Sequence, residues 1–450
     1  MTERRQCIIG AGYAGNGVAK AFTDAGIPYD HLEQTDHVGG NWAHGVYDST
    51  HIISSRDSTQ YADFPMPRDY PDFPSREQVL DYLNAYVDHF GLRERIEFGS
   101  EVVRLTPLDE RGLSGWRVEL GSGEVRHYAG VVVANGHHWA KRYPNDPGEF
   151  TGKQLHSKDY RRPSDLEGER VLVVGAGNSA CDVAVEAAHT RGPCDISMRR
   201  GNWFFPKTML GIPTAESDQP WLPAWVQRRI LTQMIRIRFG SWSRYGLPDP
   251  DYRPFDKHPI VNEEMLYFLR HGVVRARPGI ERLDGRTVHF VDGTTGNYDT
   301  IVWGTGFEIS FPFLDQDLFE WKDGVPVRVA SLLAPGVANL YVFGLLQPRG
   351  GAGPLISRGA EALTKMIHTQ ERLDHPLADD LARLRRPNAR MLVGVGETMR
   401  AIKAASAILK LISLGARLTG RALPEPPAVP PVKPAENSVE TTERNVKIAA

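Results

Sequence analysis

Two glycine-rich loops, each behind a short apolar strand, constrain the fold of this chain most. The first is a G-x-G-x-x-G loop (Gly10, Gly12 and Gly15) that follows the apolar residues 5–9 and precedes an Ala/Val-rich helical segment. Residues 29–33 then have the pattern of a second strand. Strand, glycine turn, helix and strand make one βαβ unit, whose turn and helix N-terminus suit a pyrophosphate. The sequence therefore predicts a Rossmann-like domain at its start.

The second glycine loop lies in mid-chain and has the same context. Residues 170–174 have the pattern of a strand, residues 181–189 of a helix, and residues 195–199 of the next strand. The predicted dinucleotide contacts of the intervening loop are Gly175, Gly177, Asn178, Ser179 and Ala180. Two complete units argue against a chance glycine turn and predict an α/β fold with two Rossmann-like dinucleotide-binding domains.

The residue at the end of the second strand has opposite charge in the two units. Glu33 stands 23 residues after Gly10, where a carboxylate accepts hydrogen bonds from a ribose diol and repels a 2′-phosphate. Arg199 stands 24 residues after Gly175 and is followed by Arg200, and a guanidinium pairs bidentately with a 2′-phosphate. The first unit is therefore predicted to bind the adenosine half of FAD, or NAD, and the second to bind NADPH.

The composition excludes several other classes of protein. The 450 residues suit two or three domains, and a formal net charge of −2 gives no reason to propose a nucleic-acid partner. The start of the chain has no secretory pattern. The scattered Cys7, Cys181 and Cys194 form neither a disulfide framework nor a Cys-x-x-Cys dithiol, so reduced thiols and a cytoplasmic setting are expected. No spacing typical of metal ligands is present, and no metal is predicted.

Other segments are less regular. Ser75 is expected to cap a helix, residues 98–133 alternate like antiparallel strands, and strands return at 300–303 and 339–343 before a helix from about residue 355. Residues 202–260 show no clear period and are interpreted as an insertion over a site. Its aromatic residues, which either wall a substrate channel or pack as ordinary core, are Trp203, Phe204, Trp221, Trp225 and Trp242.

The C-terminal part contains an amphipathic, basic segment at residues 398–418, with Lys403, Lys410 and Arg417. This segment is too interrupted by charge to span a bilayer. It is predicted either to lie on a membrane surface or to be an ordinary packed helix or a homodimer contact. The Pro-rich and polar residues 421–450 are predicted to form a disordered tail.

One motif before the second glycine loop is more specific than either loop. Phe150, Gly152, His156 and Tyr160 occupy every fixed position of the pattern F-x-G-x-x-x-H-x-x-x-Y/F. The chain thereby resembles the flavin-containing monooxygenases, in the class B flavoprotein monooxygenase family. Tyr160 favours the branch that oxygenates nitrogen or sulfur, because the best-known Baeyer–Villiger relatives end this pattern in Trp. The resemblance covers residues 5–370.

The resemblance also implies positions for the cofactors. Gly40, Asn41 and Trp42 are similar to the family's flavin-ribose loop. By the same resemblance, Thr305 and Gln347 are expected to place dipoles near the flavin's pyrimidine edge. The implied architecture has an NADPH domain inserted into a discontinuous FAD domain. Its predicted parts are 1–165 (FAD domain), 166–298 (NADPH domain with the insertion 202–260), 299–420 (FAD domain and C-terminal helices) and 421–450 (tail).

The family's chemistry is implied in the same way. NADPH reduces FAD, O₂ adds to give a C4a-hydroperoxyflavin, and one oxygen passes to a nitrogen or sulfur nucleophile of a small molecule. The alternatives are a Baeyer–Villiger oxygenation of a ketone or aldehyde, an uncoupled NADPH oxidase or reductase, and a flavin-binding protein without catalysis.

One departure from the family bears on these alternatives. Many members have an Asn beside the flavin where this chain has Ile53, whose side chain cannot make the amide's hydrogen bonds. The neighbouring polar residues predicted to act near the ring are Ser54, Ser55, Arg56 and Asp57. The missing Asn favours the uncoupled oxidase among the alternatives, and for Arg56 and Asp57 a surface ion pair is an equal interpretation.

Overall fold

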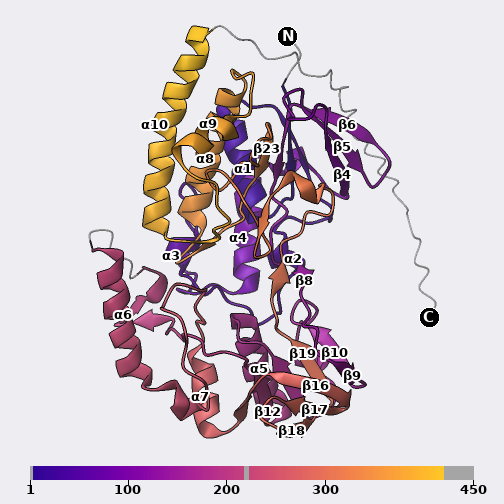
Figure 1. Ribbon diagram of the computed structural model, residues 1–450, viewed down its shortest axis with the longest axis vertical. Helices are drawn as coiled ribbons and strands as arrows, with labels where there is room; N and C mark the ends of the chain where they lie inside the picture. The colour runs from indigo at the N-terminus through magenta and orange to yellow at the C-terminus, as the bar shows by residue number, and fades with distance from the viewer. Residues whose placement is uncertain (1–3, 217–221, 420–450) are drawn as a thin grey trace, which may run out of the picture.

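The computed structural model describes residues 4–216 and 222–419, and its core is two five-stranded parallel sheets, one above the other in Figure 1. The upper sheet has the order β23-β7-β1-β2-β3. Its strands are β1 (Gln6–Ile9), β2 (Tyr29–Leu32), β3 (Ile96–Glu97), β7 (Gly130–Val133) and β23 (Leu340–Val342). The helix α1 (Tyr13–Ala25) joins β1 to β2 and ends at Gly26, which adopts a left-handed conformation. The predicted βαβ unit at the start of the chain is confirmed.

The lower sheet has the order β10-β19-β11-β12-β15, again all parallel. Its strands are β10 (Lys153–His156), β11 (Val171–Val174), β12 (Cys194–Ser197), β15 (Val274–Arg277) and β19 (Thr300–Trp303). The helices α5 (Asn178–Arg191) and α7 (Glu263–His271) pack against each other beside it. Both β10 and β19 lie outside the predicted range 166–298, because β19 pairs with β11 on one side and with β10 on the other.

The chain crosses between the two sheets twice. It leaves the upper sheet after β7 and returns to it at β23. The two crossings lie side by side, where β8 (Ala140–Lys141) pairs antiparallel with β20 (Phe307–Glu308). The lower unit is thus inserted into a discontinuous upper unit, as the order of the motifs predicts.

Two antiparallel sheets complete the units. The upper unit has β4 (Val102–Pro107), β5 (Trp116–Leu120) and β6 (Val125–Tyr128), and the lower unit has β9 (Gly148–Phe150), β16 (Ile280–Gly285), β17 (Thr287–Phe290) and β18 (Thr295–Asn297). The prediction of antiparallel strands over residues 98–133 is therefore wrong at its end. The continuously apolar β7 is buried on both faces and pairs in parallel with β1, as interior strands of such sheets do.

The irregular segment after β2 contains three helices. They are α2 (Asn41–His44), α3 (Arg56–Thr59) and α4 (Arg76–His89). Ser75 caps α4 as predicted, because its hydroxyl accepts from the Gln78 N–H while the Gln78 side chain accepts from the Ser75 N–H.

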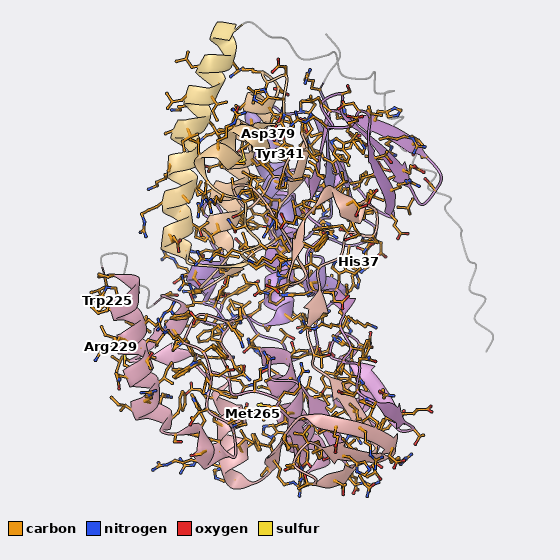
Figure 2. The ribbon with its side chains drawn as sticks, viewed as in Figure 1. His37, Trp225, Arg229, Met265, Tyr341 and Asp379 are labelled. Atoms are coloured by element: carbon orange, nitrogen blue, oxygen red, sulfur yellow. The ribbon has the colours of Figure 1, made fainter. Side chains whose placement is uncertain are left out.

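The insertion is more regular than its sequence suggested. It contains the hairpin of β13 (Thr208–Met209) and β14 (Ile212–Pro213), and the helix α6 (Ala224–Phe239). Leu231 and Ile235 of α6 are buried in the lower core, whereas Trp225 and Arg229 project outward (Figure 2). The expectation that 202–260 lacks a period is wrong for α6. Helical spacing was present there but was masked by arginines at the exposed positions.

The C-terminal helices cover one side of the upper unit (Figure 1). They are α8 (Gly353–Gln370), α9 (Leu377–Leu384) and α10 (Val395–Thr419), and the remaining short strands are β21 (Trp321–Lys322), β22 (Val325–Pro326), β24 (Gln347–Pro348) and β25 (Leu392–Val393). The helix α10 lies along α8, with Leu409 buried, so one face of it is an ordinary packed face. Across residues 4–216 and 222–419, no helix has the length and apolar character needed to cross a bilayer. The predicted tail at 421–450 lies outside the described residues.

Candidate active site

A cavity of about 1040 Å³ is lined by segments of both units. From the upper unit come Asn41, Trp42 and Gln347, and from the lower unit come residues 177–180 at the start of α5. The lower glycine loop follows the carboxyl end of β11, the edge at which open α/β sheets bind ligands. The cavity therefore brings part of each predicted dinucleotide site to one place.

The upper glycine loop is built for close approach. A Cβ on Gly15 would lie 1.8 Å from the Gly10 carbonyl oxygen, so only glycine lets α1 pack this tightly on the loop. A Cβ on Gly40 would lie 3.2 Å from the Cα of Gly12, so these two glycines face each other with no side chain between them. The two backbone segments are in direct contact, so together they present bare glycine backbone, which a pyrophosphate can approach closely. Gly10, Gly12 and Gly15 are not part of the cavity lining, whereas Tyr13 of the same loop and the neighbouring Asn41 and Trp42 are.

Glu33 is fixed beside the same loop. Its side chain is buried, and its Oε2 accepts from the Ala11 N–H at 2.7 Å. Its Oε1 accepts from the N–H and the hydroxyl of Thr35, both at 2.9 Å. Of the roughly four acceptor positions of a carboxylate, three are thus used. The remaining one suits a ribose hydroxyl.

The lower glycine loop leaves open space where the upper one does not. Gly175 has φ +136°, and a Cβ there would lie 2.1 Å from the Gly304 carbonyl oxygen. A Cβ on Gly177 would meet nothing within 4 Å. The residues of this loop that line the cavity are Gly177, Asn178, Ser179 and Ala180. The Asn178 side chain is occupied, because its Oδ1 accepts from the Val261 N–H at 2.6 Å.

Arg199 and Arg200 lie just beyond the end of β12 and are exposed. Within residues 4–216 and 222–419, neither guanidinium has a hydrogen bond or an ion pair. Burial raises the pKa of the nearby Asp146 carboxyl, and Arg199 opposes that rise. Two exposed guanidiniums at this strand end fit the 2′-phosphate of NADPH.

His137 and His138 line the cavity from the first crossing. The Nε2 atom of His137 is buried and has no hydrogen-bond partner among the described residues. Burial, with smaller contributions from His138 and Arg328, lowers the pKa of His137 to about 3, so its ring is neutral. An unpartnered ring nitrogen on a cavity wall fits a bound polar group there.

The four motif residues, by contrast, do not line the cavity: Phe150, Gly152, His156 and Tyr160. The buried His156 ring lies within hydrogen-bond distance of the Gly306 carbonyl oxygen, with 3.1 Å between Nε2 and O, while its Nδ1 accepts from the Lys158 N–H. The buried Tyr160 hydroxyl donates to the Glu186 carboxylate of α5 at 2.6 Å. Two of the four motif residues thus make structural contacts outside the cavity, His156 with the second crossing and Tyr160 with α5.

The segment predicted to act near the flavin ring is only partly at the cavity. Ile53 and Ser54 line it, and the Ser54 hydroxyl lies 2.6 Å from the Thr59 hydroxyl. Ile53 therefore presents hydrocarbon to the space in which the resemblance implies an amide.

The other three residues of this segment point elsewhere. Ser55 caps α3, with its hydroxyl accepting from the Ser58 N–H. Arg56 donates to the Tyr70 carbonyl oxygen at 2.7 Å, and its Nε contacts Asp57 at 3.0 Å, which is the surface ion pair considered as the alternative. None of the three lines the cavity, so Ser54 alone remains in position to act there.

Gln347 and Thr305, which the resemblance places near the flavin's pyrimidine edge, lie in different places relative to the cavity. Gln347 lines the cavity. The Thr305 hydroxyl donates to the Arg142 carbonyl oxygen, and the Arg142 guanidinium donates back to the Thr305 carbonyl oxygen at 2.7 Å. Thr305 thus joins the two crossings to each other and does not line the cavity.

A buried polar bridge between the units had no signal in the sequence. Tyr47 of the upper unit donates to the Asp182 carboxylate of α5 at 2.5 Å, and the Asn262 side chain donates to its other oxygen at 2.5 Å. Burial raises the pKa of Asp182. Tyr47 and Asp182 both line the cavity but stand 135 residues apart in the chain, beyond the reach of any local pattern.

A second bridge joins Lys158 to Asn41. The Lys158 ammonium donates to the Asn41 Oδ1 at 2.6 Å. Burial, with a smaller contribution from Arg161, lowers the pKa of Lys158 to about 8. A half-buried cation thus stands beside the loop that resembles the family's flavin-ribose loop.

Of the aromatic residues predicted to wall a channel or pack as core, the four that the structure describes do not line the cavity. Trp203, Phe204 and Trp242 are buried in the lower core, and Trp225 is exposed. Trp221 lies outside the described residues. The insertion instead lines the cavity with Phe205, Phe255 and aliphatic side chains, namely Met209, Leu210, Ile212, Ile230, Leu231 and Met234. It also contributes the polar side chains of Glu216, Gln227, Arg228 and His258.

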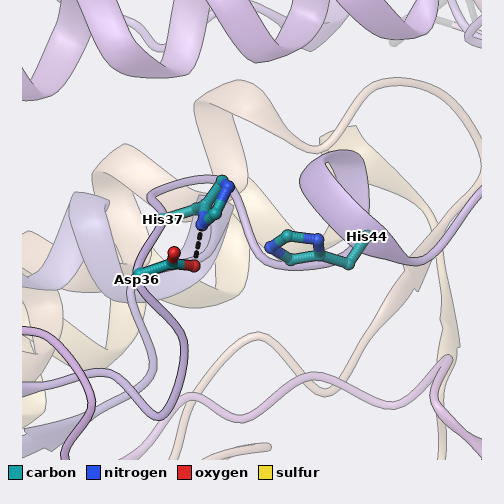
Figure 3. Close-up of side chains that lie close together, drawn as sticks. All are labelled: Asp36, His37 and His44. Atoms are coloured by element: carbon teal, nitrogen blue, oxygen red, sulfur yellow. Dashed lines mark ion pairs between the residues drawn. The ribbon is translucent and has the colours of Figure 1, made fainter.

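An exposed cluster near the upper loop contains Asp36, His37 and His44 (Figure 3). Their ligand atoms lie within 4.8 Å of one another, and His37 Nδ1 pairs with the Asp36 carboxylate. Burial and His37 lower the pKa of His44. Exposed clusters of this kind are common without a metal, and none is assigned.

Comparison with known proteins now identifies the family. A family model described as Flavin-binding monooxygenase-like matches residues 3–382. The chain belongs to this family. Flavin-containing monooxygenase 5 of Oryctolagus cuniculus is 29% identical over 384 residues, which cover 79% of this chain and 72% of that protein. Dimethylaniline monooxygenase (N-oxide-forming) 2 of the same species is 28% identical over 398 residues, covering 81% and 73%.

A solved structure agrees with the fold. The crystal structure of OTEMO in complex with FAD and NADP has a TM-score of 0.68 and 17% identity, and the match covers 90% of this chain and 98% of that one. As a family member, this chain is a flavoprotein monooxygenase whose cofactors are FAD and NADPH.

Proposed function

We infer that this monooxygenase transfers one oxygen atom of O₂ to a nitrogen or sulfur nucleophile of a small molecule. The observation that carries the inference is the single cavity lined both by residues 177–180 of the lower glycine loop and by Asn41, Trp42 and Gln347 of the upper unit. Tyr160 at the end of the motif and the relative named as N-oxide-forming support nitrogen or sulfur over a ketone.

The upper unit offers the binding residues for FAD. Gly10, Gly12 and Gly15 with Gly40 would hold the pyrophosphate, Glu33 would hold the adenosine ribose, and Asn41, Trp42 and Gln347 would hold the remainder of the cofactor. The lower unit offers Gly177, Asn178, Ser179 and Ala180 for the second pyrophosphate and Arg199 and Arg200 for the 2′-phosphate. When bound, the flavin supplies two-electron and O₂ chemistry, and the nicotinamide supplies a hydride.

The protein's own contribution is placement and exclusion of water. The wall from β13, β14 and α6 is mainly aliphatic, although Gln227 and Arg228 of α6 also line the cavity, and the neutral His137 adds a polar contact without adding charge. A soft, uncharged amine or sulfide suits such a lining better than an ionic substrate does.

Product analysis with defined substrates tests this function. The holoenzyme would be incubated with NADPH, O₂ and either a tertiary amine, an aryl methyl sulfide or a cyclic ketone. We expect N-oxide or sulfoxide, with oxygen from ¹⁸O₂, in proportion to the NADPH consumed. Lactone from the ketone, with no N-oxide or sulfoxide, would move the assignment to Baeyer–Villiger chemistry.

An uncoupled oxidase is the second candidate, because Ile53 presents hydrocarbon to the cavity. In that case the same assay would show the enzyme forming hydrogen peroxide from NADPH and O₂ at the same rate with and without substrate. Ile53→Asn would then raise the ratio of oxygenated product to peroxide.

The open face of α10 carries Leu411 and Leu414, with Lys403 and Lys410, all exposed. Peripheral membrane contact and homodimer contact are both proposed for this face. Binding to anionic vesicles that Leu411→Glu abolishes would support the first, and a dimer dissociated by the same change would support the second. A cytoplasmic location stays a prediction, and the three cysteines, all free and buried, fit it.

A further inference from the structure

Arg328 is a buried cation with only neutral partners. Its side chain is 1% exposed. Its guanidinium donates to four backbone carbonyl oxygens, those of Leu345 at 2.8 Å, Ser331 at 3.0 Å, Arg390 at 3.2 Å and Pro326 at 3.4 Å. Among the described residues, no carboxylate forms an ion pair with it. Burying an ion without a counter-ion is costly, so an arginine here calls for an explanation beyond packing.

This cation lies directly behind one wall of the cavity. The carbonyl at 2.8 Å belongs to Leu345, which immediately precedes the cavity-lining residues 346–348. On another side, the charge of Arg328 contributes to the lowered pKa of His137, which also lines the cavity. Arg328 itself is not part of the lining, so its charge reaches the cavity through one layer of protein.

The other charged groups near this wall are partly or fully exposed, or neutral. Arg400 lines the cavity without an ion pair among the described residues, but its side chain is exposed to water. Arg349 and Arg390 both face Glu397, with N–O distances of 3.9 and 3.6 Å. His137 and His138 are kept neutral by burial, which lowers their pKa values to about 3 and about 4. Arg328 is therefore the charge in this region that is both buried and unbalanced.

We propose that Arg328 is an electrostatic positioning residue that raises the reduction potential of the flavin and holds the reduced flavin in its anionic form. The inference rests on the proposed function to the extent that residues 346–348 contact the flavin. A hydride delivers two electrons and one proton, so its transfer to a neutral ring leaves one negative charge unless a second proton follows. A nearby buried cation stabilises that charge, and the low dielectric of the interior lets it act through a layer of protein.

The first test is the midpoint potential of FAD in the holoenzyme, measured by dye equilibration without substrate or O₂. Arg328→Gln is expected to lower the equilibrium constant for flavin reduction at least tenfold, which corresponds to a midpoint potential about 30 mV lower for a two-electron couple. Arg328→Lys loses most of the carbonyl contacts but keeps the charge. The midpoint potential of this variant should lie close to that of wild type when it is measured below neutral pH, where a buried lysine keeps its proton more readily.

Arg126→Gln is the matched control. Arg126 is also buried, but it is balanced by Glu97 at 2.6 Å and Glu124 at 2.7 Å, away from the cavity lining. Its loss should leave the potential unchanged. Equal shifts for Arg328→Lys and Arg328→Gln, or no shift for either, would overturn the proposal and leave Arg328 as a structural clamp.

A second test needs only the wild-type protein. Absorbance of the reduced flavin is followed against pH, beside free reduced flavin in the same buffer. Bound flavin should stay anionic at pH values where free flavin has taken up its second proton, and protonation at the same or higher pH would refute the proposal. A protein that binds no FAD, or whose flavin NADPH fails to reduce, would instead refute the proposed function.

Discussion

The opposite cofactor preferences proposed for the two glycine units rest on individual side chains. Glu33 is buried and locked by Ala11 and Thr35, whereas Arg199 and Arg200 are exposed at the corresponding end of the other unit. The positions of these residues at the strand ends could be predicted from the sequence, because charge type and spacing are local properties, while their contacts with the cofactors stay a prediction. The sequence could not predict that Ser55, Arg56 and Asp57 turn away from the cavity, since the N-cap of α3 and the contact with Tyr70 are decided by the folded loop.

Removing the Arg199 guanidinium should weaken the binding of NADPH much more than that of NADH. Charge-assisted hydrogen bonds contribute roughly 1.5–3 kcal/mol, so Arg199→Ala is expected to raise the KM for NADPH about tenfold to a hundredfold while leaving that for NADH nearly unchanged. Steady-state rates against coenzyme concentration measure both. Arg229→Ala, an equally exposed arginine on α6, serves as the control. Equal losses for both coenzymes would contradict the phosphate assignment.

The space at Gly177 gives a test that separates binding from folding. A Cβ there meets nothing within 4 Å, so Gly177→Ala should leave the unfolding temperature of the cofactor-free protein at or above that of wild type. If a pyrophosphate uses that space, NADP⁺ affinity should fall at least about tenfold. Calorimetric titration measures the affinity, with Gly415→Ala, also in open space, as the control. Unchanged affinity would place the nucleotide elsewhere.

Lys158 should make stability depend on pH. Burial holds its pKa at about 8, below that of a lysine in the unfolded chain. Between those two values the unfolded chain binds more protons, so wild-type stability gains from this residue as pH rises through roughly 8 to 10. Lys158→Met lacks that gain. The Tm of the variant minus that of wild type should therefore decrease from about pH 7 to pH 10, and a constant difference would mean that the amine is not desolvated.

At the scale of elements, the sequence predicted the central strands well and the connections poorly. Val171–Val174 and Thr300–Trp303 are continuous apolar runs beside glycine turns, which is a strong local signal. The insertion lacked such a signal, because α6 mixes its apolar positions with arginines, and its buried residues Leu231 and Ile235 are defined only by packing into the lower core. The bridge from Tyr47 to Asp182 depends on tertiary structure in the same way.

The wall formed by α6 should control substrate size without affecting the coenzyme. Met234 lines the cavity, so Met234→Trp reduces its volume from the side of the insertion. We expect a bulky aryl sulfide to show a KM raised several-fold, with a small sulfide and the rate of flavin reduction by NADPH unchanged. Steady-state and single-turnover kinetics on the same preparation measure all three. An equal effect on NADPH would mean that α6 walls the coenzyme site instead.

At the scale of the whole molecule, two parallel sheets are joined by two paired crossings, and segments of both units line one cavity. The β8–β20 pair, the His156 contact with Gly306 and the mutual contacts of Thr305 and Arg142 hold the crossings together. Chain order alone predicted the insertion of one unit into the other. The position of the cavity between them required the folded structure, because its lining comes from segments spread from Tyr13 to Arg400.

The most direct test of the central claim is stopped-flow absorbance of the purified holoenzyme, reduced anaerobically with NADPH and then mixed with O₂. We expect NADPH to bleach the oxidised flavin fully, and to do so much faster than NADH. A transient absorbance species distinct from oxidised and reduced flavin should follow, and it should decay faster when an amine or sulfide is added. Flavin that NADPH cannot bleach would contradict the account. Reoxidation with stoichiometric peroxide, unaffected by any amine or sulfide, would contradict its oxygen-transfer step.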